Sequence, residues 1–490
     1  MPIVKVTIIG GGIAGLATAY SLLKHAALAN LPITCTLLES TQHFGGKIRT
    51  ELIGDFIIEG GPDSFLSYKP WGVGLCRELG LGDRLMGTNT QHHRTYVLYN
   101  GRLREFPEGL VTLAPSQALP LFMSPLLSMA GKLRLLMDLF VAKSPSNGTD
   151  ESLASFFRRR FGAEVFERLI EPLMTGIYAG DAEQLSLRAT FPRFLEFEQQ
   201  YGSIIKGMLA SRRQRMKSDT GTQPKLTTFV TLRGGLVEMV RALVASLERT
   251  GKEKMLLRNG VRVTGLTQAS SGEKPKYEVT LDSGESLSSD AVVLATPAFT
   301  AADLLMALDS GVAEQLRTIP YTSTATVSLA YPAASLSNAH SLKGFGFVIP
   351  RVENRKLVAS TWTSTKWAHR SPSDHSLIRC YLGGVGREDI VFRDDQDIIR
   401  LVQGELRDIL GITADPALSR VYRWKNAIPQ YLVGHLDRLV EIEERLIQHP
   451  GLCVTGSAYR GVGLPDCIHE GDLTAKKLVD YFLASGAVKQ

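Results

Sequence analysis

The stretch VTIIGGGIAGLATAY, residues 6–20, decides the fold class of this chain. The apolar residues at 3–9 predict a buried β-strand, and the small and apolar residues at 13–25 predict a helix. ITCTLLES, residues 33–40, predicts a second strand. Because this order is typical of parallel strands joined by a helix, the N-terminal region predicts an α/β fold with a parallel sheet.

The turn between the first strand and the helix contains the pattern G-x-G-x-x-G at Gly10, Gly12 and Gly15. The first glycine permits the tight turn, the second lets the backbone approach a pyrophosphate, and the third lets the helix pack closely on the strand. The helix N-terminus then faces the diphosphate. Glu39 ends the next strand, where a carboxylate accepts from a ribose hydroxyl. The pattern therefore predicts a dinucleotide site rather than a glycine turn without a ligand.

Three further stretches favour FAD over NAD. GGKIRTE at 45–51 and EGGPDSFL at 59–66 add glycine turns that let the backbone follow the cofactor. GVGLPDCIHEG at 461–471 precedes a helix whose N-terminus can face the pyrimidine oxygens of a flavin, where negative charge develops on reduction. We expect the FAD to be non-covalent, since no cysteine lies in a motif for a covalent link.

Composition restricts the other classes of function. The chain has 490 residues, of which 44% are hydrophobic and 21% charged, as expected of a globular protein with two or three domains. A net charge of +6 is too small to indicate nucleic acid, but it suits an acidic substrate or an anionic membrane surface. The five cysteines form no C-x-x-C pair, so we expect neither a metal site nor a disulfide framework, and a reducing compartment fits. We find no signal-peptide pattern at the N-terminus.

One segment is apolar enough to require a membrane test. Residues 109–131, GLVTLAPSQALPLFMSPLLSMAG, carry no charge and are long enough to span a bilayer. Three prolines interrupt them, so we expect a broken helix near the substrate entrance, or an apolar surface that touches a membrane from one side. The protein is accordingly expected in the cytoplasm, at most peripheral to the inner face of the membrane. The basic residues at 158–160 and the basic connector at 208–225 could steer an acidic substrate.

Motifs along the whole chain resemble the porphyrinogen oxidase family of the flavin monoamine oxidase superfamily, and they point to the soluble type of Gram-positive bacteria. They are GPDSFL at 61–66, the block from SLASFF to EQLSL at 152–187, FVTLRGGL at 229–236, GFGFVIP at 344–350, TWTSTKW at 361–367, IPQY at 428–431 and GVGLPDCI at 461–468. The resemblance implies a Rossmann-type FAD-binding domain with an inserted mixed-sheet substrate domain and a helical domain, as in monoamine oxidase and p-hydroxybenzoate hydroxylase.

Each of these three domains is expected in particular segments of the chain. The FAD-binding domain is expected at 1–77, 226–300 and 416–490. The substrate domain is expected at 191–225 and 301–415. A helical domain that faces the substrate entrance or a membrane is expected at 78–190.

The resemblance also implies which residues contact the cofactor, from the diphosphate to the isoalloxazine ring. They are Gly10, Gly11, Gly12, Ile13, Ala14 and Gly15 at the diphosphate; Glu39 and Ser40 at the adenosine ribose; Lys47 in the glycine-pair motif; Gly61, Pro62, Asp63 and Ser64 beside the flavin; Val263 on the adenine side; Trp424; and Val462, Gly463 and Leu464 at the isoalloxazine end.

For the substrate, the resemblance implies a tetrapyrrole held above the flavin, with the backbone carbonyl of Gly176 facing the pyrroles. Val348 and Trp362 are expected on either side of the macrocycle and Tyr381 at its edge. Plant enzymes carry smaller aliphatic residues or Phe at these last two positions. Plant and human enzymes also carry an arginine soon after the motif LGL, where this chain has a glycine, so Lys69 is the expected partner of a propionate.

The implied activity is the oxidation of coproporphyrinogen III to coproporphyrin III in heme biosynthesis, with protoporphyrinogen IX as the alternative substrate. Hydride leaves a meso carbon for the flavin, dioxygen reoxidises the flavin and yields peroxide, and three rounds give the porphyrin. Because the cofactor carries the chemistry, we expect no catalytic side chain. The sequence leaves open a flavin amine or carotenoid oxidoreductase, and also a non-catalytic flavoprotein that delivers porphyrin to the next enzyme of the heme pathway.

Overall fold

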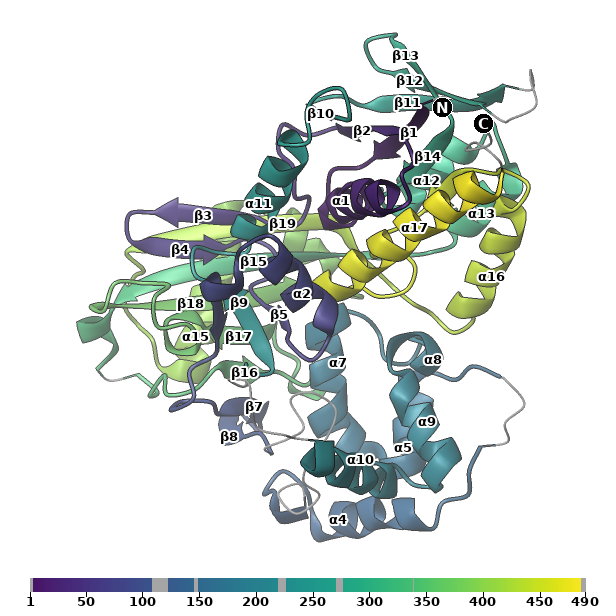
Figure 1. The fold of residues 1–490 in the computed structure, drawn as a ribbon. Helices are drawn as coiled ribbons and strands as arrows, with labels where there is room; N and C mark the ends of the chain where they lie inside the picture. Colours follow the sequence, from purple (N-terminus) through teal and green to yellow (C-terminus); the bar gives the residue numbers. More distant parts are fainter. Residues whose placement is uncertain are drawn as a thin grey trace.

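The computed structural model describes residues 3–107, 122–144, 149–218, 226–269, 276–337 and 339–485. They form three parts: a parallel sheet with helices at one end, a mixed sheet in the middle, and a layer of helices at the other end (Figure 1). The expected α/β fold with an inserted mixed sheet and a helical part is confirmed.

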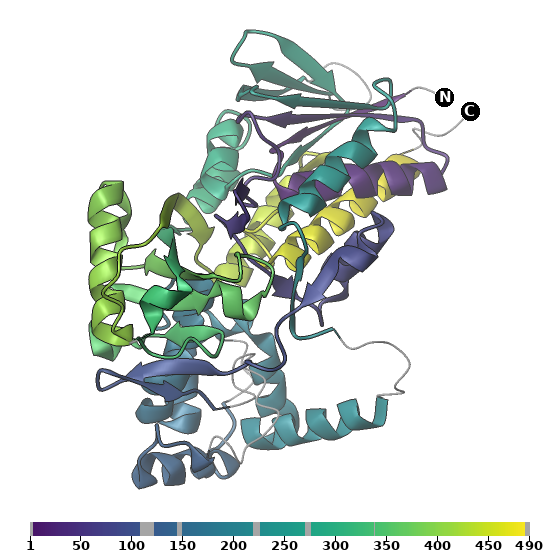
Figure 2. The ribbon, with the colours of Figure 1, turned by 90° about the vertical axis from the view of Figure 1, so that its left-hand side faces the viewer.

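The parallel sheet contains the predicted strand–turn–helix–strand unit. Its strands, in spatial order, are β10 (Met255–Asn259), β2 (Ile33–Glu39), β1 (Val4–Ile9), β14 (Ala291–Leu294) and β20 (Leu452–Val454). The helices α1 (Ile13–Leu28), α11 (Val237–Glu248) and α17 (Leu464–Ala484) cover the sheet. The first and last helices of the chain, α1 and α17, lie side by side (Figures 1 and 2). This brings the C-terminal glycine loop back to the N-terminal glycine turn.

Smaller elements surround this sheet. An antiparallel three-stranded sheet consists of β11 (Val263–Ala269), β12 (Lys276–Leu281) and β13 (Ser286–Ser289). The remaining elements on this side are β5 (Phe65–Leu66), β6 (Leu85–Gly87), β9 (Phe229–Leu232), α2 (Pro70–Glu78), α12 (Ala298–Leu305), α13 (Ser310–Arg317) and α16 (His435–Leu446). The pair β3 (Thr50–Ile53) and β4 (Phe56–Glu59) packs against the mixed sheet described next.

The mixed sheet has seven strands and two different faces. In spatial order they are β19 (Leu418–Pro429), β15 (Tyr321–Pro332), β18 (His375–Gly383), β17 (Leu357–Trp362), β16 (Gly346–Val348), β7 (Thr95–Tyr99) and β8 (Arg102–Glu105). α15 (Asp395–Leu410) packs on one face through a core of aliphatic and aromatic side chains (Figure 2). The short helix α14 (Thr363–Lys366) follows β17.

The helical layer packs through a core rich in phenylalanine. Its helices are α4 (Met129–Leu136), α5 (Leu153–Phe161), α6 (Ala163–Val165), α7 (Glu171–Tyr178), α8 (Leu187–Thr190), α9 (Pro192–Tyr201) and α10 (Ile204–Ser218). A π-helical turn at Phe166–Ile170 leads into α7. Residues 109–121 of the uncharged segment lie outside the described residues. Within the part of the chain that the structure describes, no helix meets the length and hydropathy of a membrane span.

The structure corrects the expected domain boundaries in three places. The segment 78–190 contains β6, which pairs with β9, and then β7 and β8, which belong to the mixed sheet, so the helical part starts later. The segment 191–225 is helical where it is described, because α9 and α10 pack within the helical layer and not on the sheet. The segment 416–490 begins with β19, an edge strand of the mixed sheet. Each boundary depends on strand pairing or helix packing between distant segments, which the sequence does not show.

The basic residues at 158–160 do not form a free cationic patch. Arg160 is fully buried, and its guanidinium binds the carboxylates of Asp138 at 2.6 Å and Glu198 at 3.2 Å. Arg159 also pairs with Glu198, at 2.7 Å. Arg158 pairs with Glu183 at 2.6 Å. The positive charges are therefore used inside the helical layer, which corrects the expectation that they steer an acidic substrate.

Candidate FAD and substrate site

The turn before α1 has the geometry of a diphosphate site. Gly10 has φ +109°, and a Cβ there would lie 2.6 Å from the carbonyl oxygen of Ala295. A Cβ on Gly15 would lie 1.9 Å from the carbonyl oxygen of Gly10. By contrast, a Cβ on Gly12 would meet no atom within 4 Å. Two glycines are thus required by protein contacts, while Gly12 borders open space at the helix N-terminus, where a phosphate group fits.

The carboxylate of Glu39 lies beside this turn at the end of β2. It accepts hydrogen bonds from the backbone N–H of Gly11 at 2.7 Å and of Thr41 at 2.8 Å. Ser40 lies next to it, and the backbone N–H of Val261 donates to the carbonyl of Glu39 at 2.9 Å. The latter contact brings the start of β11, at Val263, to the same end of the sheet. Glu39, Ser40 and Val263 therefore lie close together, as a ribose and adenine site requires.

The second glycine segment continues the site from the first. The N–H of Gly45 donates to the carbonyl of Gly11 at 2.8 Å. Burial lowers the pKa of the Lys47 ammonium, although the side chain keeps accessible surface. Gly61 packs so closely on this segment that its Cβ would lie 1.8 Å from the Lys47 carbonyl oxygen.

Side chains from the mixed sheet hold the turn at 60–64. The carbonyl oxygen of Gly60 accepts from Trp424 Nε1 at 2.8 Å, from Thr326 Oγ1 at 3.1 Å and from the Arg379 guanidinium at 3.1 Å. Arg379 also donates to the carbonyl of Gly61. Trp424 was expected near the cofactor, whereas Thr326 and Arg379 were missed. No local signal could have identified them, because they come from separate strands that only the fold brings together.

Asp63, in the same turn, is an ionised carboxylate. Lys366 Nζ donates to one of its oxygens at 3.0 Å and Ser64 Oγ to the other at 2.6 Å. Burial acts to raise the pKa of Asp63, but the Lys366 and Arg379 cations outweigh it and hold this pKa well below its ordinary value. Pro62 precedes Asp63 within the turn. The predicted residues 61–64 thus form one rigid, charged segment next to Lys47.

The C-terminal loop closes the site from the opposite side. α17 begins at Leu464, directly after Val462 and Gly463, so its N-terminus points out of this loop. The N–H of Gly461 donates to the hydroxyl oxygen of Tyr431 at 2.9 Å, which anchors the loop to the end of β19. Val462 packs against the core of the helical layer. The loop therefore connects the cofactor-binding part with the helical part.

Lys69 is not a free cation in this structure. Its Nζ donates to both carboxylate oxygens of Asp466 at 2.7 Å, and its side chain is 31% exposed. Asp466 lies in the first turn of α17, so the pair joins the start of α2 to the cofactor-facing loop. A propionate could bind Lys69 only in competition with Asp466. The sequence indicated Lys69 but gave no sign of this partner.

Strand register separates the expected substrate residues into two groups. Val348 lies opposite Ala359, which lies opposite Tyr381, which in turn lies opposite Thr326. These four residues form a row across one face of the mixed sheet, the face that also carries Arg379 and Trp424. We call this row with Thr361 the substrate face. Tyr381 Oη lies 3.3 Å from Thr361 Oγ1.

Trp362 lies on the other face, which corrects the expectation that it flanks the substrate together with Val348. It pairs with Ile378, is fully buried, and packs beside Phe347 in the core under α15. Because side chains alternate along a strand, Trp362 points away from the substrate face and Thr361 points toward it. Gly176 has exposed surface on α7, in the helical layer next to β16 (Figure 1).

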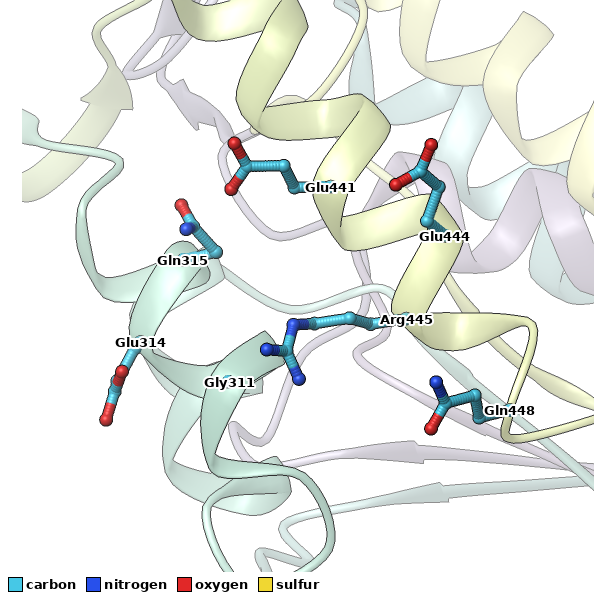
Figure 3. Close-up of a pocket in the computed structure, with 7 residues that line it drawn as sticks. All are labelled: Gly311, Glu314, Gln315, Glu441, Glu444, Arg445 and Gln448. Carbon is cyan, nitrogen blue, oxygen red and sulfur yellow. The ribbon is translucent and has the colours of Figure 1, made fainter.

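A hollow on the surface of the described residues lies elsewhere. It measures about 490 Å³ and lies between α13 and α16, with the Arg445 guanidinium reaching across it (Figure 3). The residues that line it are Gly311, Glu314, Gln315, Glu441, Glu444, Arg445 and Gln448. None of them belongs to the glycine turns or to the substrate face. This polar groove is therefore separate from the candidate site.

Fold and site together define an FAD-dependent oxidoreductase of the amine oxidase type. The family model described as flavin containing amine oxidoreductase matches residues 13–479, and the chain belongs to this family. It is 39% identical to coproporphyrinogen III oxidase of Bacillus subtilis over 98% of both chains. It is 33% identical to the enzyme of the same name from Staphylococcus aureus, over 97% of this chain and 99% of that one.

Other relatives and solved structures agree with this family. Chloroplastic protoporphyrinogen oxidase of Oryza sativa is 32% identical over 97% of this chain and 88% of its own. A solved structure from Exiguobacterium sp. superposes with a TM-score of 0.80 at 31% identity, over 97% of this chain and 98% of that one. Reduced UDP-galactopyranose mutase, at 16% identity and a TM-score of 0.67 over 97% and 95% of the two chains, shares the fold.

Proposed function

We propose that this protein oxidises coproporphyrinogen III to coproporphyrin III with dioxygen, releasing hydrogen peroxide, as a step of heme biosynthesis. The observation that carries the proposal is the substrate face, a row of aliphatic, hydroxyl and aromatic side chains from Val348 to Tyr381. It ends beside the strands that hold the Gly60–Gly61 turn. The apolar and aromatic side chains of this face can pack against a tetrapyrrole macrocycle. The full-length similarity to named coproporphyrinogen III oxidases supports the same substrate.

The chain itself contributes binding and orientation. When bound, FAD accepts hydride from the substrate and passes the electrons to dioxygen. Gly12 and the first turn of α1 would hold its diphosphate, Glu39 its ribose, and residues 61–64 would lie beside its flavin. Tyr381, fixed by Thr361, and Val348 would position the macrocycle, with the Gly176 carbonyl accepting from pyrrole N–H groups. Orientation of this kind is what a reaction carried by the cofactor requires of the protein.

A comparison of kcat/KM for the two porphyrinogens tests the proposal. The purified protein, loaded with FAD, is expected to favour coproporphyrinogen III over protoporphyrinogen IX. The named protoporphyrinogen oxidases that also match the chain make the second substrate the alternative. A higher kcat/KM for protoporphyrinogen IX would reject the proposed substrate but keep the proposed reaction. No porphyrin product from either substrate would reject both.

We further propose that the protein is cytoplasmic and that its helical layer makes peripheral contact with the membrane. The support is a group of exposed apolar side chains on and after α4: Met129, Leu133, Met137 and Phe140, which are 67%, 61%, 52% and 85% exposed. Cosedimentation with anionic vesicles tests this, with Phe140→Asp expected to weaken it. Equal binding by both proteins would argue against this surface. Transient contact with the next enzyme of the heme pathway stays a prediction.

A further inference from the structure

Five charged side chains lie at and beneath the turn at 60–64, and we call them the buried charge cluster: Glu59, Arg370 and Arg379, which are buried, and Asp63 and Lys366, which are partly buried. Lys366 and Asp63 form one ion pair at 3.0 Å. Arg370 and Glu59 form another at 3.3 Å, with side chains only 1% and 5% exposed. Among the described residues, no carboxylate lies within ion-pair distance of Arg379. Three cations and two carboxylates thus leave one positive charge, and the geometry assigns it to Arg379.

The hydrogen-bond partners of Arg379 do not neutralise this charge. The residue is 4% exposed, and its acceptors are the neutral carbonyl oxygens of Gly60 and Gly61. Its guanidinium carbon also lies 5.0 Å from the centre of the Tyr381 ring. A buried cation with neutral partners exerts a stronger field on its neighbours than an exposed one, because water does not screen it.

Arg379 differs from the other side chains that hold this turn. Thr326 and Trp424 each donate one hydrogen bond to the Gly60 carbonyl, and both are uncharged. Arg379 reaches two consecutive carbonyls from one guanidinium, and it also contacts the substrate face through Tyr381. It therefore links the cofactor turn and the substrate face.

We propose that Arg379 is a positioning residue for the flavin: it fixes the Gly60–Gly61 turn and places the unpaired charge of the buried charge cluster next to the cofactor. The proposal rests on the placement of the flavin beside residues 61–64. A reduced flavin is richer in electrons than an oxidised one, so a nearby buried cation favours the reduced form. Arg379 thereby makes the bound flavin a stronger acceptor of hydride than it would be without this charge.

The reduction potential of the bound flavin, measured by equilibration with a reference dye, tests this proposal without any porphyrinogen. Arg379→Gln removes the charge, and the equilibrium constant for reduction is expected to fall about tenfold, which is about 30 mV for a two-electron couple. Thr326→Val is the matched control, because it removes one hydrogen bond to the same carbonyl but no charge. Its potential is expected to stay at the wild-type value. Since no porphyrinogen is present, this result does not depend on the proposed substrate.

Arg379→Lys separates charge from position. Lysine keeps the charge but does not present a planar pair of donors, so the potential is expected to stay near wild type while FAD dissociates more readily. If the Arg379→Gln protein does not retain FAD, the potential is measured in the Ser328→Asp protein instead. Ser328 lies opposite Arg379 on β15, and a carboxylate there neutralises the charge and is expected to lower the potential. An unchanged potential in a charge-removing or charge-neutralising variant would overturn the proposal. Equal FAD retention by Arg379→Lys and wild type would overturn the positioning role.

Discussion

The diphosphate turn and the substrate face show how differently two halves of one site depend on the sequence. Gly10, Gly12 and Gly15 act within six residues, and their spacing alone predicts their roles. Val348 and Tyr381 come from separate strands and meet only through the register of β16, β17 and β18. The first half is therefore controlled by local backbone geometry. The second half is controlled by strand pairing, where a shift of one residue exchanges the two faces.

The largest effects are expected in the diphosphate turn, where two glycines with different surroundings should fail in different ways. Gly15→Val forces a side chain into the Gly10 carbonyl and is expected to lower the free energy of unfolding by about 3 kcal/mol or more. A Cβ on Gly12 meets no protein atom within 4 Å, so the Gly12→Val apoprotein should be close to wild type in stability, while FAD affinity falls at least about a hundredfold. Thermal melts of the apoproteins and flavin absorbance check both. A yellow, fully loaded Gly12→Val protein would contradict the diphosphate assignment.

The next largest effects are expected from substitutions on the two faces of the mixed sheet, one of which should change stability and the other KM. Trp362→Ala leaves a large hollow in the core under α15 and is expected to cost about 3–5 kcal/mol of stability. Val348→Ala removes a partly buried side chain on the other face, so it should change KM several-fold with a much smaller change in Tm. Denaturant unfolding and steady-state kinetics check the pair. If Trp362→Ala changed KM and left stability unaltered, the assignment of the faces would be reversed.

A pH-dependent effect is expected under the C-terminal loop. Burial is the main reason that the pKa of His435 falls from 6.5 to about 4, with the Arg438 and Arg460 cations adding to it. The unfolded chain takes up this proton as the pH drops below 6.5, whereas the folded protein does not until about pH 4. Stability should therefore fall across this window, by about 3 kcal/mol in total. His435→Gln, followed by thermal melts at several pH values, should show a shallower decline; an identical decline would remove His435 as its source.

The smallest effect concerns Lys69. Lys69→Ala is expected to raise KM for coproporphyrinogen by about tenfold if the lysine leaves Asp466 to bind a propionate. Asp466→Asn is the matched control, because it frees Lys69 and should then lower KM or leave it unchanged. If both variants instead weaken FAD retention equally and leave KM unaltered, the pair serves only to hold the loop before α17.

The sequence predicted most of what depends on neighbouring residues. The strand–helix–strand unit and the glycine turn lie where the local patterns indicated. What could not be predicted depends on contacts between distant segments. The family motifs predict that Trp362 and Val348 flank the substrate together. The alternation of side chains along β17 instead places Trp362 on the opposite face of the sheet. No local pattern marks Arg379 as a site residue, because only the fold brings it to the carbonyls of Gly60 and Gly61.

The partners of charged residues could not be predicted from the sequence either. A sequence shows charges but not their partners. It therefore predicts that Lys69 and the arginines at 158–160 are available to an acidic substrate. In the structure Asp466 neutralises Lys69, and Asp138 and Glu198 neutralise Arg160. Asp63 is a predicted site residue whose partner is also invisible in the sequence. Its carboxylate is held by Lys366, about three hundred residues further along the chain.

The central claim, that this chain oxidises a porphyrinogen on a flavin beside the substrate face, is tested most directly by stopped-flow mixing. The FAD-loaded protein is mixed with coproporphyrinogen III in air, and flavin absorbance and porphyrin fluorescence are followed together. We predict that the flavin band bleaches and then recovers while porphyrin fluorescence rises, and that Val348→Ala slows the bleaching. An unbleached flavin band during porphyrinogen binding would contradict the claim and indicate a protein that binds tetrapyrroles without oxidising them.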